Sequence, residues 1–566
     1  MAGVFAAGWT PWTAALDDGR LSFWVGWMLA LLVAAWAWWR GPAVRSSRPA
    51  LAIDPAESAL IFGVAVASRL WLRTRMTGAA FFGDEPFDSC IHPYELSRGE
   101  QLGLGGATNV LTYATYLAAY RVLGFSPMTA RLVNALVYAA SVAVFAATAR
   151  VAVSVVAARA LAVMLLVGTS FVPHSVYATA ITFGLLPVAF LTWVLRGPVR
   201  PRHAVAAAAI TAASLLLYPG GFLTSVVLLG ASLTIGRRAW GWPARASLVV
   251  GTVVFGWSAL QLRTLATGSA AYGQWAGGVL ATNHAWRGVW VTLGDTFWST
   301  TSWNSLAGAM PYLDPALTGC FVVGMALAFG GGLSARAPAL WSALALAGFL
   351  GTTVAVSFAG DYPGIRRAYA AMPLVSLVAA IGFDEIWRRG PRPMVGVAAV
   401  VGLLCVAADV RALSRFWPHS GGYRAIDDAR TLIGEQTAWG QDVVIVGTSA
   451  DQYRAQHLRC WLGLDPDIAR RIGSLRALPT VAVPAPLALP RRVLLLAIAP
   501  LSEAQLLALL GRAPVRIDTV AGVGSGRDRV HAAYEFESTR WVQMDSARQN
   551  AASTPASGTT SERNPS

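Results

Sequence analysis

The run TARLVNALVYAASVAVFAATA, residues 129–149, carries a single charged side chain, Arg131, and is followed directly by Arg150. An α-helix needs about 20 predominantly apolar residues to cross the hydrocarbon core of a bilayer. Comparable runs recur along the chain, bounded by arginines, so we expect an all-α polytopic membrane bundle of about 12 transmembrane helices. The expected spans are residues 21–39, 57–73, 129–149, 158–176, 178–196, 203–218, 221–236, 246–262, 315–333, 338–358, 368–386 and 393–410.

The composition favours the same class. Of the 566 residues, 55% are hydrophobic and only 13% are charged. A soluble globular chain usually carries about twice that charged fraction. The net charge of +15 is explained by arginines at the cytoplasmic ends of spans. We therefore expect the lipid bilayer as the environment and no nucleic-acid partner.

The arginines also predict an orientation. With the N-terminus outside, every second short loop is basic, as the positive-inside bias requires. The basic loops hold Arg40, Arg45, Arg48, Arg150, Arg159, Arg196, Arg200, Arg202, Arg237, Arg238, Arg245, Arg336, Arg388, Arg389 and Arg392. We expect a multi-pass protein of the inner or plasma membrane with its N-terminus extracytoplasmic. Residues 107–124 would spoil this alternation as a full span; their tyrosines and Arg121 favour an interfacial helix, and whether the segment spans stays open.

Four parts follow from this organisation. They are residues 1–56, an extra transmembrane helix with a cytoplasmic loop; 57–410, the transmembrane domain with outer loops 74–128 and 263–314; 411–545, an extracytoplasmic domain; and 546–566, a disordered tail. Within 411–545, the β-branched runs Asp442–Val446 and Val493–Ile498 alternate with helix-like runs. That alternation predicts a small α/β domain. In the transmembrane domain, Pro219–Gly221 is either a tight reversal or a break within one longer helix.

The most informative outer segment is FFGDEPFDSCIHPY, residues 81–94. It places Asp84, Glu85, Asp88 and His92 directly after a span. A partly desolvated carboxylate at a membrane surface can act as a general base toward a hydroxyl. Acids with a histidine can also hold a metal, so Asp88 and His92 are candidate ligands of a divalent cation. The alternative is a solvated turn whose acids cap the following helix.

The four cysteines are too few and too scattered for a disulfide framework or a zinc site. Cys320 and Cys405 lie in apolar runs and are expected to be small packing residues. Cys90 and Cys460 fall in segments placed outside the membrane. A bridge between them is compatible with that placement, but nothing in the spacing requires it.

The series that begins with Asp84–Glu85 resembles the N-terminal signature of the GT-C glycosyltransferases. A span is followed at once by the acid pair, then by Gly99–Gly106, and then by the run Leu111–Leu132. The series is similar to the branch that contains protein O-mannosyltransferases, lipid A aminoarabinose transferases and Rgt-like bacterial enzymes. The order of features matches over about 57–150. The span count and the outer C-terminal domain fit over most of the chain.

This resemblance implies transfer of a sugar from a polyprenyl-phosphate-linked donor to a glycan, lipid or protein acceptor on the extracytoplasmic face. It implies that Asp84 is the catalytic base or positions the acceptor, with Glu85 supporting it directly or through a divalent cation. Arginine suits the donor phosphate through its forked donors, and the matching positions are Arg131, Arg366 and Arg367. Further substrate-binding candidates on outer segments are His174, Tyr177 and Tyr362.

Several features have a more ordinary interpretation. Interfacial snorkelling competes with phosphate binding for the outer arginines, and suits Arg69 and Arg73 well. The aromatic-rich outer loop 263–314 is better interpreted as an amphipathic segment with tryptophan anchors than as a cover for the active site. His284 and Asp295 in that loop have no assigned role.

Two other function classes stay open. A polytopic transporter or flippase would carry ionisable residues deep in its spans and two matching halves, and neither stands out here. A catalytically degenerate binder of lipid-linked sugars is the second, because Tyr218 stands where the family often has a basic residue. No glycine-rich phosphate loop appears in a strand–helix context, so we expect no nucleotide cofactor.

Overall fold

The computed structural model describes two sets of residues. In the helical part they are 54–75, 87–97, 109–167, 179–267, 285–297, 312–313, 315–331, 337–358 and 368–389; in the C-terminal part they are 441–447, 459–460, 462–463, 472–479, 492–497, 516–519 and 532–537. The chain divides into a larger unit with most residues up to Gly421 and a smaller one that includes Gly422–Ser566. The expected spans 21–39 and 393–410, and the tail 546–566, lie outside the described residues.

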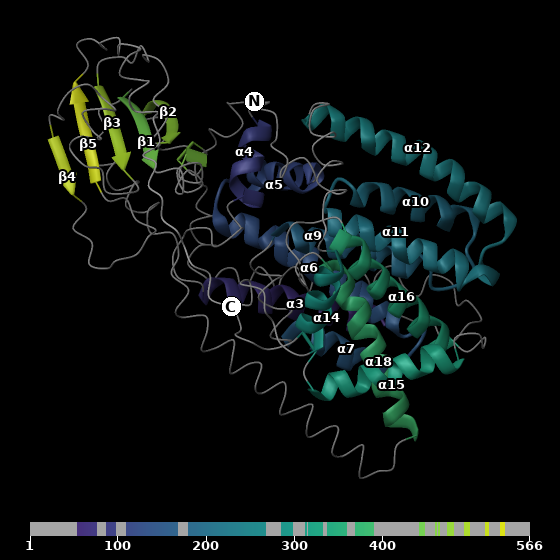
Figure 1. Cartoon of the computed structure of the whole chain (residues 1–566). Helices are drawn as coiled ribbons and strands as arrows, with labels where there is room; N and C mark the ends of the chain where they lie inside the picture. The colour runs from purple at the N-terminus through teal and green to yellow at the C-terminus, as the bar shows by residue number, and fades with distance from the viewer. Residues whose placement is uncertain are drawn as a thin grey trace, which may run out of the picture. The chain divides into compact units, whose positions relative to one another are not determined.

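Each expected span within the described ranges coincides with a helix (Figure 1). These helices are α3 (Pro55–Arg75), α6 (Pro127–Ala149), α7 (Val155–Val167), α9 (Thr179–Val194), α10 (Pro201–Ser214), α11 (Pro219–Thr234), α12 (Trp242–Thr267), α15 (Pro315–Gly331), α16 (Ala337–Phe358) and α18 (Met372–Arg389). Among the described residues, four helical segments are long and apolar enough to cross a membrane: Pro127–Ala149, Trp242–Arg263, Pro338–Ser357 and Tyr369–Arg388. These segments indicate a helical membrane protein, and the count of about 12 spans stays a prediction.

The break at Pro219 separates two helices. α10 ends at Ser214, and Tyr218 is extended, with φ −167° and ψ 131°, before Pro219 starts α11. Both α10 and α11 pack against α9. Pro219 has no backbone N–H to continue the α10 ladder but suits the first turn of a new helix. The alternative of one longer broken helix is therefore excluded.

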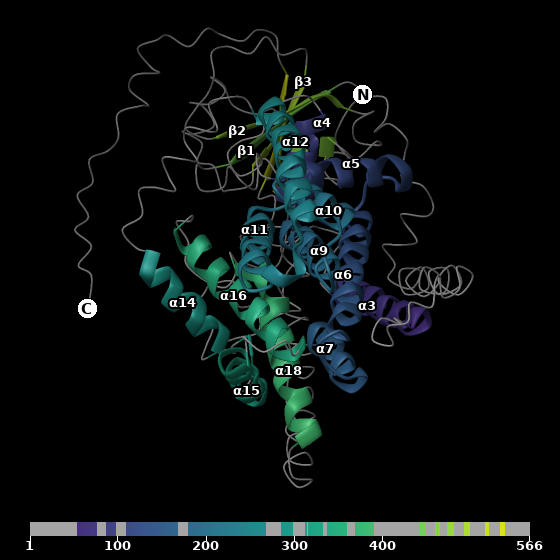
Figure 2. The same cartoon turned by 90° about the vertical axis from the view of Figure 1, so that its right-hand side faces the viewer.

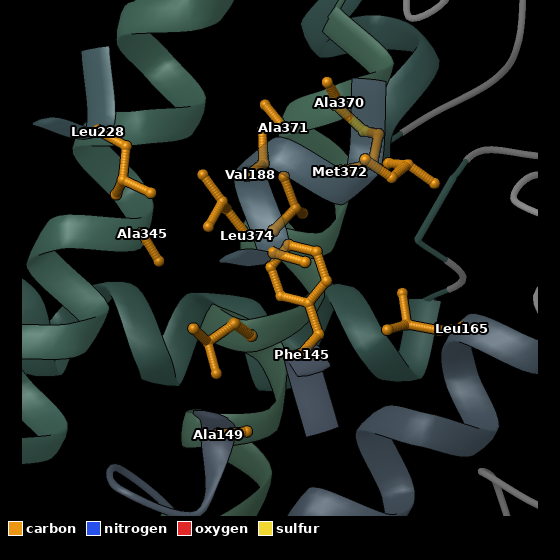
Figure 3. Close-up of a cluster of buried hydrophobic side chains, with 14 of the residues drawn as sticks. Phe145, Ala149, Leu165, Val188, Leu228, Ala345, Ala370, Ala371, Met372 and Leu374 are labelled. Atoms are coloured by element: carbon orange, nitrogen blue, oxygen red, sulfur yellow. The ribbon is translucent and has the colours of Figure 1, made fainter. Parts of the chain in front are cut away.

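Glycines set the closest helix contacts. A side-chain carbon added at Gly382 of α18 would overlap the carbonyl oxygen of Cys320 on α15, and one at Gly221 of α11 would lie 2.7 Å from Cα of Gly184 on α9. Small residues let helix backbones approach in a membrane, where packing rather than apolar burial drives association. Around these contacts, side chains from α6, α7, α9, α11, α16 and α18 form one core (Figure 3). Its members include Phe145, Leu165, Val188, Leu228, Ala345 and Leu374.

Ion pairs join the helices at the end of the bundle where α3 begins. Glu57 of α3 pairs with Arg150, which follows α6, and with Arg159 of α7, whose Nε lies 3.1 Å from Oε1. Figure 2 shows α3, α6 and α7 grouped together. The α6–α7 connection also meets α18, because the Ser154 hydroxyl donates to Asp384. Three of the arginines expected in basic loops, Arg150, Arg159 and Arg388, thus belong to one end of the bundle.

The smaller unit contains a five-stranded sheet. Its strands are β1 (Gln441–Gly447), β2 (Ile472–Pro479), β3 (Arg492–Ala497), β4 (Arg516–Thr519) and β5 (Ala532–Glu537), in the order β2-β1-β3-β5-β4. β1 runs parallel to β2 and β3, and β5 is antiparallel to β3 and β4. The two β-branched runs are β1 and β3, paired with Asp442 opposite Val493. Parallel neighbours require crossover connections, as in α/β folds; the helical half of that prediction falls outside the described residues.

Candidate functional site

The segment after α3 is packed against a short helix. It consists of the π-helical turn η3 (Phe87–Ile91) and α4 (His92–Ser97), and it contacts α5 (Val110–Leu123). The 14 residues of α5 extend only about 21 Å at 1.5 Å per residue. α5 is also absent from the helices that qualify as span candidates within the described ranges. An interfacial position for residues 107–124 is consistent with both observations.

The α5 tyrosines do not lie in the membrane interface, which was the reason for expecting an interfacial helix. Tyr113, Tyr116 and Tyr120 are buried in the protein instead of resting at the membrane surface. The exposed face carries small and apolar residues with Arg121 at its end; they are Leu111, Ala114, Thr115, Ala118 and Val122. The sequence was compatible with either environment, because tyrosine suits both a membrane interface and a polar contact inside a protein.

Hydrogen bonds fix α5 on both sides. The Tyr120 hydroxyl donates to the backbone carbonyl of Ser89. At the start of α5, the backbone N–H of Leu111 donates to the carbonyl of Leu216 at 2.8 Å, and the Thr112 hydroxyl donates to that of Leu217 at 2.8 Å. α5 therefore connects residues 87–97 to the α10–α11 connection.

Asp88 and His92 both lie close to Tyr113. The His92 ring is 5.1 Å from the Tyr113 ring, centroid to centroid. Burial, and next the negative charge of Asp88, raise the pKa of Tyr113 well above its ordinary value. The phenol therefore stays protonated, as a hydrogen-bond donor, through the neutral range.

The described residues do not make a metal site from Asp88 and His92. Within the part of the chain that the structure describes, no three His, Cys, Asp or Glu side chains come together as metal ligands. His92 Nδ1 lies 2.9 Å from Glu95 Oε2, so this ring nitrogen is engaged within α4. Metal binding by Asp88 and His92 stays a prediction.

α6 places a row of polar side chains inside the bundle. Ser126 caps its N-terminus, accepting from the backbone N–H of Thr129 at 3.0 Å, and Pro127 opens the first turn. Arg131, Asn134 and Tyr138 then follow at i, i+3 and i+7, which share one helix face. All three are buried, and Arg131 is only 3% exposed. Arg131 is therefore an interior residue, and its side chain does not snorkel to the surface.

Arg69 contradicts the snorkelling interpretation more strongly. Its side chain on α3 is 1% exposed. Its guanidinium carbon lies 4.0 Å from the centre of the Tyr138 ring, and Nη2 donates to the carbonyl of Leu165 at 3.2 Å. The Tyr138 hydroxyl donates to the same carbonyl. The helix α6 supplies an aromatic face and α7 an acceptor, so the guanidinium is held inside the protein; the side chain of Arg73 is not described.

The segment 263–314, for which we expect an outer loop, contains the described helix α14 (Ala285–Phe297). Trp290 is 69% exposed, as expected of an interfacial anchor, whereas Asp295 is fully buried. The backbone N–H of Tyr312 donates to the carbonyl of Asp295 at 2.9 Å, and the Tyr312 hydroxyl lies 3.0 Å from that of Ser376 on α18. Tyr312 thus attaches this segment to α18. The aromatic content of the segment did not predict that contact.

The cysteines differ in redox state. Cys90 and Cys460 are each disulfide-bonded and buried. Cys320 on α15 is buried and forms no disulfide, which agrees with its expected role as a small packing residue. Cys405 lies outside the described residues.

Most of the candidate site residues lie outside the described ranges. They are Asp84, Glu85, His174, Tyr177, Tyr362, Arg366 and Arg367. Arg69 and Asn134 are interior polar residues that were not among the predicted site residues. The signal was present: Arg69 lies inside an expected span, and Asn134 lies one turn from both Arg131 and Tyr138 on α6.

Comparison with known proteins leaves the family open. No protein-family model matches the chain, and no curated protein is significantly similar to it.

Proposed function

We propose that this protein is a membrane glycosyltransferase of the GT-C type. It would move a sugar from a polyprenyl-phosphate-linked donor to a glycan, lipid or protein acceptor on the extracytoplasmic face of the cell membrane. The observation that carries the proposal is the packing of residues 87–97 against α5. α5 in turn contacts α6, whose N-terminal part carries the buried Arg131. The acid pair Asp84–Glu85 directly precedes this anchored segment.

The proposed orientation has the acid pair, the N-terminus and the smaller unit outside, with about 12 spans between them. The disulfide-bonded state of Cys90 supports this orientation, because disulfides persist in oxidising compartments. Cys460 gives the same support for an extracytoplasmic α/β domain. That domain is proposed to help recognise the acceptor.

In the proposed reaction, Asp84 accepts the proton of an acceptor hydroxyl, and Glu85 supports it. The acceptor oxygen bonds to the anomeric carbon while the bond from that carbon to the phosphate oxygen breaks. The electron pair leaves with the polyprenyl phosphate, held by Arg131, Arg366 and Arg367. A single displacement of this kind inverts the anomeric centre. The remaining substrate contacts are assigned to His174, Tyr177 and Tyr362.

A carrier or binder of lipid-linked sugars that performs no chemistry is the second candidate. Arg69 favours it, because a buried ionisable residue within a span is typical of a binding or transport pathway. The two candidates share donor binding and differ in turnover. They are therefore separated by a transfer assay.

The test is transfer of labelled sugar from a panel of polyprenyl-phosphate donors by the purified full chain. We expect Asp84→Asn to lower transfer by about 100- to 10,000-fold, the usual contribution of a general base. Asp54→Asn is the matched control, because Asp54 is exposed and caps α3 through the backbone N–H of Ala56, a role that asparagine can take over. Transfer that survives Asp84→Asn would remove Asp84 from the mechanism; donor binding without any transfer would favour the carrier.

A further inference from the structure

Four buried polar side chains lie on the packed helices α3 and α6. Arg131, Asn134 and Tyr138 lie on one face of α6, and Arg69 of α3 lies against the Tyr138 ring. We call these four residues the α6 donor stripe. Each is at most 3% exposed. The side chains offer guanidinium, amide and hydroxyl donors, and no carboxylate is among them.

Some donors of the stripe have no hydrogen-bond partner among the residues that the structure describes. They are Nε and Nη1 of Arg69 and Nδ2 of Asn134. The acceptor side of Asn134 is used, because its Oδ1 lies 3.4 Å from the Tyr116 hydroxyl that donates to it. Buried donors are normally satisfied, so three unsatisfied N–H-bearing atoms on one stripe require an explanation.

Among the described residues, no acid neutralises the charge of Arg69. Arg69 forms no ion pair with any residue that the structure describes, and its guanidinium contacts the Leu165 carbonyl and Tyr138. Glu57, the acid on the same helix, is engaged by Arg150 and Arg159. It also lies twelve positions earlier, about 18 Å along the helix axis. A buried guanidinium without a counter-charge marks a place where an anion would bind favourably.

We propose that the α6 donor stripe binds an oxyanion, specifically a phosphate group, through Arg69 and Asn134. The inference rests on the proposed function, in which a lipid-linked phosphate is the donor's leaving group, and it names residues that the resemblance did not supply. Guanidinium and amide N–H groups are suitable donors to phosphate oxygens. The competing interpretation is that Arg69 only holds α7 in place through Leu165.

The experiment measures binding and thermal unfolding of the purified full chain with three probes: polyprenyl monophosphate, the polyprenol of the same length, and inorganic phosphate. The variants are Arg69→Met, Asn134→Ala and, as matched control, Arg121→Met, an exposed arginine on α5. We expect polyprenyl monophosphate to raise the Tm of the wild type. The Kd should rise about tenfold or more in Arg69→Met and about two- to fivefold in Asn134→Ala, as expected for loss of a charged and of a neutral donor. Arg121→Met should leave it unchanged.

The outcomes separate the two ideas. Equal Kd for the wild type and both stripe variants overturns the inference and leaves the glycosyltransferase proposal standing, as does equal protection by polyprenol and polyprenyl phosphate. A fall in Tm that is the same with and without ligand identifies Arg69 as a structural contact of α7 only. Inorganic phosphate that protects in an Arg69-dependent way supports an oxyanion site filled from a free source. Arg69-dependent binding without sugar transfer supports the stripe and removes the enzyme. Should Arg69→Met fail to fold, Asn134→Ala decides alone.

Discussion

Two regions of the helical unit differ in whether their buried charged side chains contact a group of opposite charge. At the end where α3 begins, Glu57 binds Arg150 and Arg159, and Asp384 binds Arg388 and Ser154. In the α6 donor stripe, Arg69 contacts a carbonyl and a ring, and within the described part of the chain it has no acid partner and two of its nitrogens have no hydrogen-bond partner. A paired charge stabilises helix contacts, whereas an uncompensated one costs stability unless a ligand supplies the opposite charge. The paired charges of Glu57 and Asp384 therefore suit a structural role, whereas the charge of Arg69 suits the binding of an anion.

Breaking the Glu57 pairs should produce the largest stability effect. Glu57→Gln leaves Arg150 partly buried without its anion, and we expect the unfolding free energy to fall by about 2 kcal/mol, between the values for an exposed and a buried pair. The effect should weaken little with salt, because the Glu57 side chain is only 14% exposed. Denaturant unfolding in detergent measures it. A loss below that of Arg388→Gln would remove the contrast between the two regions.

The pH dependence of stability in Tyr113→Phe tests the contact between residues 87–97 and α5. Burial and Asp88 raise the pKa of Tyr113 well above the unfolded value of about 10. The native state then holds a proton that the unfolded chain loses, so this stabilising contribution is complete below pH ~10 and is lost as pH rises toward the folded pKa. We expect the Tm of the wild type to fall more steeply above pH ~10 than that of Tyr113→Phe. Parallel curves would show that the pKa of Tyr113 is not raised in the folded protein.

Arg388→Gln should change stability less. Arg388 pairs with Asp384 at 3.0 Å, but its own side chain is 54% exposed, so solvent screens the pair. We expect a loss below about 1 kcal/mol that shrinks further at high salt. The salt dependence of unfolding distinguishes this exposed pair from the Glu57 pairs. A large, salt-independent loss would mean that Asp384 depends on Arg388 alone.

Arg69→Met should have the smallest effect on stability. Methionine replaces an uncompensated buried charge with an apolar side chain of similar length, and such replacements are often neutral or stabilising. We expect the unfolding free energy without ligand to change by less than about 1 kcal/mol, as the lost hydrogen bond and ring contact offset the removed charge. Thermal unfolding of the ligand-free variant measures it. A loss as large as that of Glu57→Gln would assign Arg69 a structural role instead.

The sequence predicted well where local rules govern. Apolar runs near the length of a span became helices, and the β-branched runs at Asp442 and Val493 became neighbouring parallel strands. Local rules failed for tyrosine and arginine, which are amphipathic. The membrane interface and the protein interior suit the tyrosines of α5 and the guanidinium of Arg69 equally well. Which environment each side chain takes depends on what packs against it.

Sequence alone determined the helical membrane class, most helix positions and the strands β1 and β3, because apolar period and β-branching act over a few neighbouring residues. Tertiary structure decided which polar groups meet. Arg69 reaches Leu165 across 96 positions, and Ser154 reaches Asp384 across 230. The Glu57 ion pairs and the Arg69–Tyr138 contact depend on how α3, α6 and α7 pack. The spacing of Asp384 and Arg388, and that of the polar residues on α6, is instead a local helix pattern.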